Sequence, residues 1–161
     1  VLIKTMSIVI KEAPELKAVI IGPGDQRPYI SLAHRLGVEK NVVFLGFVDE
    51  DTKIGAIDAS LALVLPSVCD YVEVYPMVIS EAWARCKPVV ATSVGGIPYR
   101  VKHKVNGLLV PPRNPCALAD AIIELYNDRN LAEKLGREGR KEVHSWDEIV
   151  DKLINIYRSL I

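Results

Sequence analysis

A regular alternation of short apolar segments with helix-like segments is the feature that most constrains this chain. The apolar segments are continuous runs rich in Val, Ile and Leu, which predicts strands that are covered on both faces of a sheet. They occupy residues 17–21, 41–45, 61–65, 88–92 and 107–110. Helix-like segments lie between them, at residues 2–12, 28–36, 51–59 and 77–85. Strands that alternate with helices form parallel βαβ units, so we expect an α/β fold with an open, doubly wound, Rossmann-like parallel sheet.

Three further helices are expected to close the domain over residues 117–161. In the first, apolar residues recur at helical spacing and mark one buried face. They are Leu118, Ala121, Ile122, Leu125 and Tyr126. The second, residues 130–142, is highly charged and contains two glycines, so we expect it at the surface. The third carries an apolar stripe over residues 149–161, and Ser145 with Glu148 predicts a capping box at its start.

Length and charge limit the kind of protein. A chain of 161 residues fits one domain, so we expect residues 1–161 to form a single domain. Its 20 Lys and Arg balance 20 Asp and Glu, which excludes a generally basic nucleic-acid binder. The first residue is Val1 and the first readable element is a helix, whereas a doubly wound unit begins with a strand. We therefore expect a fragment that is missing the first strand of its sheet.

Targeting and metal signals are weak in this sequence. No run approaches the roughly 18 apolar residues of a transmembrane helix, and no signal-peptide pattern precedes Lys11, so we expect a cytoplasmic protein. Cys69, Cys86 and Cys116 form no CxxC pair, which argues against a zinc site or a disulfide framework. No metal is expected, since the acidic residues next to His144 are explained by helix capping.

The loops that follow the predicted strands are where a ligand is expected. In an open α/β sheet the ligand crevice lies beyond the carboxyl ends of the strands, here residues 22–25, 46–48, 66–76 and 93–98. The third of these loops leads into a helix expected from Met77, and a helix N-terminus attracts phosphate.

Two glutamates flank that helix start. Glu73 lies just before it and Glu81 lies in its second turn. A carboxylate here can accept hydrogen bonds from sugar or ribose hydroxyls, or stabilise positive charge that develops at an anomeric carbon. From the pattern alone, Glu73 can equally be a solvated loop acid and Glu81 a helix acid favoured by the macrodipole.

Several motifs follow one another in a fixed order. They are Pro66-Ser67, Glu73 and Glu81 separated by seven residues, Val94-Gly95-Gly96-Ile97-Pro98 and Asn106-Gly107-Leu108-Leu109-Val110. This series resembles the C-terminal half of the retaining GT-B glycosyltransferases of the family-4, or "group 1", type. Further similarity, at Ile21-Gly22-Pro23-Gly24 and Ser145-Trp146 for example, extends it over nearly the whole chain.

The resemblance implies a role for each matching residue. Glu73 would contact the donor sugar beside the reacting centre, and Glu81 would bind the ribose hydroxyls. The main chain around Val74, Tyr75, Met77 and Val78 would meet the donor sugar and the distal phosphate. The turn of Gly46, Phe47 and Val48 would hold the nucleotide base, while Gly22 and Gly24 would let the backbone approach the nucleotide.

The chain departs from the family pattern in three respects. Pro76 and the bulky Tyr75 stand where the family often has glycines. A basic run of Arg100, Lys102, His103 and Lys104 replaces the usual acids after the Gly-Gly pair, as a solvated loop or as a patch for an acidic acceptor or lipid headgroup. The Arg and Lys that hold the diphosphate in the family, and the N-terminal acceptor-binding domain, are absent from the sequence.

The sequence therefore predicts the donor-binding half of a retaining hexosyltransferase. Its donor substrate would be a nucleoside-diphosphate sugar, no separate cofactor is implied, and the isolated chain would be inactive. The full-length protein could lie at the inner face of a membrane. Two alternatives stay open: half of a GT-B nucleotide-sugar epimerase, and a non-catalytic nucleotide-binding domain. Gly22-Pro23-Gly24 lacks the third glycine of a dinucleotide-binding site. No residue is identified as a general base that would activate the Cys69 thiol. Trp83 is expected in the core or at a domain interface.

Overall fold

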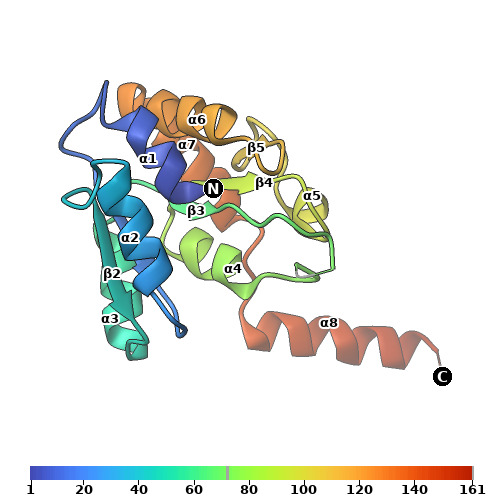
Figure 1. The fold of residues 1–161 in the computed structure, drawn as a ribbon. Helices are drawn as coiled ribbons and strands as arrows, with labels where there is room; N and C mark the ends of the chain where they lie inside the picture. Colours follow the sequence, from blue (N-terminus) through green and yellow to red (C-terminus); the bar gives the residue numbers. More distant parts are fainter. Residues whose placement is uncertain (72, 161) are drawn as a thin grey trace.

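A computed structural model describes residues 1–71 and 73–160, so Val72 and Ile161 lie outside the described residues. Helices and strands alternate through most of the chain, as the sequence predicted (Figure 1). The strands are β1 (Ala18–Ile21), β2 (Val42–Gly46), β3 (Leu63–Leu65), β4 (Val89–Thr92) and β5 (Leu108–Val110). The helices between them are α1 (Leu2–Val9), α2 (Arg27–Arg35), α3 (Glu50–Ala59), α4 (Met77–Ala84) and α5 (Ile97–Arg100). Three helices follow: α6 (Pro115–Asn127), α7 (Arg129–Arg140) and α8 (Trp146–Ser159).

The strands form two parallel sheets in the described residues, β1-β2 and β3-β4-β5. Ala18 pairs with Val42 in the first sheet, and in the second Val90 pairs with Val64 and Leu108. A doubly wound sheet has the order 3-2-1-4-5-6 along its width. The described strands fit the order β2-β1-x-β3-β4-β5, in which no described strand occupies the position x. The expected parallel α/β arrangement is thus observed, with its strands divided between two sheets instead of joined in one.

Two apolar clusters lie on opposite faces of this arrangement. The first joins α1, α2 and α6 to residues from both sheets, including Ile20, Phe44 and Val90. The second joins α3, α4 and α5 to β3, β4 and β5 only. Figure 1 shows α1 and α6 on one side of β3 and β4, with α4 on the other. Only the three-stranded sheet is therefore covered on both faces.

Helix α7 is more closely packed than its charged sequence predicted. Leu135 is fully buried, and a Cβ atom at Gly136 would lie 1.9 Å from the carbonyl oxygen of Cys86. At Gly139 a Cβ atom would lie 2.1 Å from the ring of Trp83. Most of its charged side chains are exposed, as expected of a surface helix, but the opposite face packs closely because the two glycines let α7 approach α4 at van der Waals distance.

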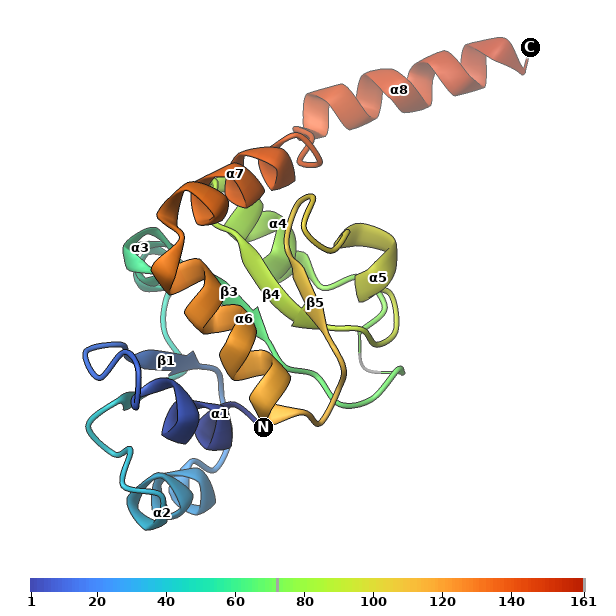
Figure 2. The ribbon, with the colours of Figure 1, turned by 90° about the horizontal axis from the view of Figure 1, so that it is seen from above.

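The end of the chain projects from the rest of the molecule. The capping box of α8 is confirmed, since Ser145 Oγ accepts the N–H of Glu148 and the Glu148 carboxylate accepts the N–H of Ser145. Figures 1 and 2 show α8 extending away from the other helices. The described part of its apolar stripe is largely exposed, with Leu153, Tyr157 and Leu160 among the exposed side chains, and so is Trp146 at the helix start.

Candidate functional site

The loop after β3 is fixed in place by the loop after β4. Thr92 Oγ1 at the end of β4 donates to the carbonyl oxygen of Ser67 at 2.7 Å. Gly95 N–H donates to Asp70 Oδ1 at 3.1 Å, and Gly96 N–H donates to the carbonyl oxygen of Glu73 at 2.6 Å. The described residues of the two predicted ligand loops, 66–71, 73–76 and 93–98, therefore form one unit at the carboxyl edge of the sheet.

The carboxylate of Glu73 has a defined partner. Ser67 Oγ donates to Glu73 Oε1 at 2.5 Å, so the side chain and the main chain of Glu73 are both held by the described residues. The Glu73 side chain is only half-buried. An anion of this kind, oriented and still accessible, can accept a hydroxyl group or face developing positive charge.

The close approach of these loops explains the Gly-Gly pair. A Cβ atom at Gly96 would lie 1.9 Å from the carbonyl oxygen of Val74, and one at Gly95 would lie 2.5 Å from that of Glu73. Gly95 also has a φ of +52°, which L side chains rarely adopt. Neither position can carry a side chain without moving the loop that bears Glu73.

Helix α4 begins directly after this loop, at Met77. No side chain caps it within the described residues, and its N-cap residue is Pro76. The N–H groups of Met77 and Val78 consequently have no intrahelical acceptor and carry the positive end of the helix dipole. Val74, Tyr75 and Met77 are exposed, and Val78 is half-buried. The α4 start thus combines accessible N–H donors with the nearby Glu73 carboxylate.

Glu81, one turn further along α4, meets a cation that the sequence reasoning missed. Lys53 Nζ from α3 lies 3.0 Å from Glu81 Oε2 and 3.0 Å from Glu50 Oε1. Contacts with the carboxylates of Glu50 first and of Glu81 second raise the pKa of Lys53 above its ordinary value. Glu81 Oε2 is buried and makes no hydrogen bond of good angular geometry within the described residues, so its contact with Lys53 is an ion pair.

The glycines after β1 and β2 lie together. Gly22 N–H donates to the carbonyl oxygen of Gly46 at 2.8 Å, and Gly22, Gly24 and Gly46 all have positive φ angles. Phe47 is largely exposed and Val48 half-buried, so the turn presents main chain and one aromatic ring at this edge. Helix α3 follows the Gly46 turn and carries Lys53, so the ion pair of Lys53 with Glu81 joins this side of the molecule to α4.

The basic run after the Gly-Gly pair is engaged within the chain. Lys102 Nζ donates to the carbonyl oxygen of Pro98 at 2.9 Å, and Lys104 Nζ lies 3.0 Å from Glu124 Oε1. His103 Nδ1 accepts the N–H of Leu109 at 3.1 Å. These contacts favour a structural role for the run over a patch for an acidic acceptor or lipid headgroup, because the side chains are engaged with their own chain.

Trp83 and Asp49 have structural roles. Trp83 is buried, as expected, and its Nε1 donates to the carbonyl oxygen of Asn106 at 3.1 Å. The Asp-x-Asp triplet at residues 49–51 belongs to a helix start, since Asp49 Oδ1 accepts the N–H of Thr52 as the N-cap of α3. That hydrogen bond is the first cause of the lowered pKa of Asp49. Among the described residues, no helix is long and apolar enough to cross a bilayer.

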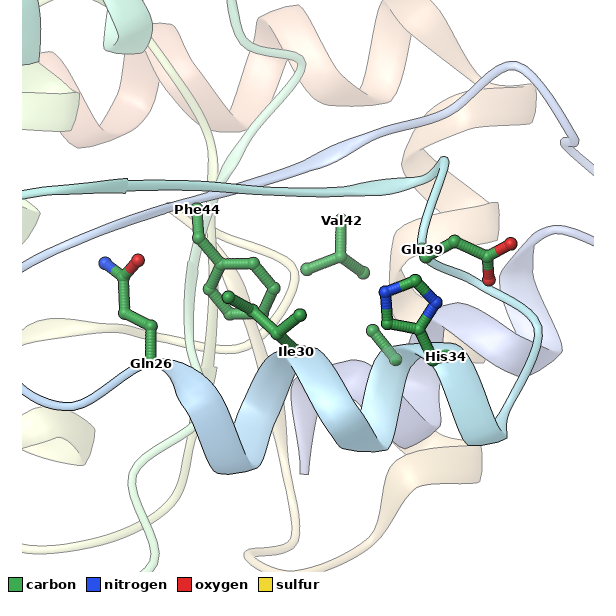
Figure 3. A pocket seen from close by; sticks show the side chains of 7 residues that line it. Gln26, Ile30, His34, Glu39, Val42 and Phe44 are labelled. Carbon is green, nitrogen blue, oxygen red and sulfur yellow. The ribbon is translucent and has the colours of Figure 1, made fainter.

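A cavity of 340 Å³ lies between α2 and β2, on the side of the molecule that carries the Gly46 turn (Figure 3). Ile30 and His34 from α2 face Val42 and Phe44 from β2, and Gln26 lies at one end. It forms part of the more open half of the molecule, where only Ala33 of α2 is fully buried. Neither candidate glutamate lines it, but Gln26 at its end lies beside the predicted base-binding turn, since a Cβ atom at Gly46 would lie 3.4 Å from Gln26 Nε2.

The family described as "Glycosyl transferases group 1" matches residues 1–142, and the chain belongs to this family. It is 39% identical over 153 residues to an uncharacterised glycosyltransferase of Methanocaldococcus jannaschii, which covers 92% of this chain and 38% of that protein. It is 37% identical over 153 residues to a GDP-mannose-dependent alpha-(1-6)-phosphatidylinositol monomannoside mannosyltransferase of Mycobacterium tuberculosis, covering 87% and 38%. The chain thus spans less than half the length of these relatives.

Solved structures place the chain within the longer proteins. The C-terminal domain of a group 1 glycosyltransferase (LpcC) from Francisella tularensis superimposes with a TM-score of 0.75 at 27% identity, covering 86% of this chain and 73% of that one. The Anabaena protein HepE in complex with UDP-glucose gives a TM-score of 0.82 at 26% identity, covering 98% and 44%. The chain therefore has the fold of a GT-B C-terminal domain, as the motif series implied.

Proposed function

We propose that this chain is the donor-binding domain of a retaining hexosyltransferase and that Glu73 and Glu81 hold the nucleotide-sugar. Residues 1–161 would act as one domain, and the donor would lie between it and an N-terminal domain that binds the acceptor. The isolated chain would not turn over donor, because it holds only one side of the site. The observation that carries the proposal is the Glu73 carboxylate, oriented by Ser67 beside the uncapped start of α4.

Each group has a stated task in this proposal. The N–H groups of Met77 and Val78 would donate to the distal phosphate and stabilise the negative charge on the departing nucleoside diphosphate. The Glu73 carboxylate would bind the donor sugar and face the positive charge that develops at its anomeric carbon. The Glu81 carboxylate, close to Lys53, would accept ribose hydroxyls.

The nucleotide base would lie at the other half of the same edge. The main chain at Gly22, Gly24 and Gly46 would approach it closely, and Phe47 with Val48 would border it. Because main-chain contacts read a base weakly, the relatives' names leave both uridine and guanosine as candidates: UDP-glucose is bound by HepE and GDP-mannose is used by the mycobacterial enzyme.

Calorimetric titration of the full-length protein with UDP-glucose and with GDP-mannose tests the proposal. Glu81→Ala is expected to weaken binding about 10-fold or more, as the loss of a charged hydrogen bond does. Glu73→Gln is expected to lower kcat more than it raises KM, since the carboxylate charge matters most in the transition state. Glu133→Ala, which removes an exposed α7 carboxylate with a local partner, serves as the control. Unchanged binding and turnover in both site variants would refute the assignment.

A further inference from the structure

Arg100, the last residue of α5, makes three contacts that meet at one place, besides a 5.4 Å approach of its guanidinium carbon to the ring centroid of Trp83. Its Nη1 donates to the carbonyl oxygen of Pro76 at 2.7 Å, and its Nη2 donates to Ser80 Oγ at 2.5 Å. Its guanidinium carbon lies 4.0 Å from the ring centroid of Tyr75. Tyr75, Pro76 and Ser80 together span the junction between the Glu73 loop and α4.

A guanidinium group suits this position for physical reasons. It is planar and has several donors in a fixed fork, so it can bind a carbonyl oxygen and a hydroxyl while one face stacks on an aromatic ring. Arg100 is half-buried, and burial lowers its pKa from the ordinary value, although an arginine stays charged. Hydrogen bonds from a partly desolvated charge are stronger than those of an exposed surface pair.

Few other contacts of the described residues hold this junction in place. Pro76 has no N–H, and α4 has no side-chain cap. Upstream, Gly96 N–H and Ser67 Oγ fix Glu73, but Val74 is largely exposed. Arg100 is thus the side chain that joins the end of this loop to the first turn of α4.

We infer that Arg100 is a positioning residue that sets the α4 N-terminus against the Glu73 carboxylate, so that both meet the same donor. Arg100 itself would not touch the donor. The inference deepens the proposed function and rests on it, because the groups that Arg100 positions are those assigned to the donor sugar and the distal phosphate.

Variants at Arg100 and a matched control separate positioning from general stability. Arg100→Ala removes all three contacts, whereas Arg100→Lys keeps the charge but not the fork. Arg85→Ala is the control: Arg85 caps the far end of α4, and its Nε and Nη2 bind the Asp58 carboxylate at 2.6 and 2.5 Å. This control removes an arginine whose two charged hydrogen bonds join the far end of α4 to α3, and it leaves the junction intact.

Hydrogen exchange in the full-length protein without ligand is the first readout. We expect Arg100→Ala to speed exchange in peptides that cover residues 73–80, with Arg100→Lys intermediate and Arg85→Ala unchanged in this segment. Unchanged exchange over residues 73–80 in Arg100→Ala would overturn the inference, whatever the donor turns out to be.

Titration with UDP-glucose and GDP-mannose is the second readout. Arg100→Ala is expected to weaken the binding of the nucleotide-sugar about 10-fold, to change the affinity for the free nucleoside less, and to recover in part when guanidinium ion is added at millimolar concentration. Equal losses in Arg100→Ala and Arg85→Ala would reduce Arg100 to a stability residue. If Glu81→Ala weakens binding and Arg100→Ala does not, the inference fails while the proposed function stands; if neither does, the proposed function fails.

Discussion

The strands of the two sheets have similar sequences, but helices cover both faces of one sheet and leave a face of the other open. β1 and β4 are both short runs of mainly Val, Ile and Ala, yet every residue of β4 is buried while Val19 in β1 is 48% exposed. The difference lies in the helices, because α3, α4 and α5 cover only the three-stranded sheet. An apolar run therefore predicts that a strand can be buried, and the neighbours determine whether it is.

The edges of the two sheets show the same contrast. Ala18 N–H and Gly22 N–H donate toward β2, so the alternate residues Val19 and Ile21 direct their main-chain groups away from it. Leu63 N–H donates toward β4, which leaves the main chain of Val64 directed away from β4 in the same manner. One parallel strand between β1 and β3 would bond to both edges and complete a single sheet.

The largest effect is expected from one substitution made in both sheets. Leu108→Ala in β5 removes a fully buried side chain and should lower the free energy of unfolding by about 2–5 kcal/mol. Leu45→Ala in β2, where Leu45 is 43% exposed, should cost less than about 1 kcal/mol. Urea unfolding of the chain measures both, and equal costs would contradict the difference in burial.

A second pair of variants tests the loop contacts of the three-stranded half. Gly96→Ala forces a Cβ atom against the carbonyl oxygen of Val74 and should cost about 1–3 kcal/mol as overpacking does, together with weaker nucleotide-sugar binding. Gly55→Ala in α3 meets no atom within 4 Å and should stabilise the chain by up to about 1 kcal/mol through helix propensity. A Gly96→Ala variant with normal binding would show that the loop can move without harm to the site.

The uncovered face of β1-β2 leads to a third prediction. Val19→Lys should change the free energy of unfolding by less than about 0.5 kcal/mol, since the side chain is exposed. It should also reduce association of the isolated chain at high concentration, because exposed apolar strands pair with one another. Light scattering measures the association, and an unchanged signal would mean that this face does not drive it.

The smallest effect concerns an ion pair between α3 and α4. The hydrogen bond from Arg85 is the first cause that holds the pKa of Asp58 below its ordinary value. Stability from this pair is therefore present above the unfolded-state pKa of about 3.9 and is lost as the pH falls through the lower folded-state pKa. In Asp58→Asn, the unfolding midpoint should fall slightly less as the pH is lowered. Asp25→Asn, which breaks a pair with Arg27 two residues away, is the comparison, because that contact joins no two helices or strands.

Much of the fold could be predicted because its signals are local. The strands that end at Ile21, Leu65 and Val110 were expected at those residues, and the capping box at Ser145 requires only four consecutive residues. The short helix α5 was not predicted, since four residues carry no periodicity. The close packing of one face of α7 was not predicted, because a glycine that permits close approach and one that weakens a helix are indistinguishable until the neighbour is known.

The candidate site shows the same division. Glu73 and Glu81 were recognised by their spacing and by the resemblance of the surrounding motifs, and their roles stay predictions. Lys53 was missed, because its partner Glu81 lies on another helix and no local pattern joins them. Arg100 was noticed only as one charge in a basic run, while its contacts with Pro76 and Ser80 depend on where α5 lies against α4.

The sequence by itself determined the order of the strands and of the helices other than α5, the capping box at Ser145, the positions of the two glutamates and the family. These follow from backbone preferences and from side-chain periodicity, which act over a few residues. The tertiary structure alone decided which apolar strands are covered, which charges are neutralised and which arginine reaches the Glu73 loop. Burial and ion pairing depend on distances between segments far apart in the chain, and those distances exist only once the helices have packed on the sheets.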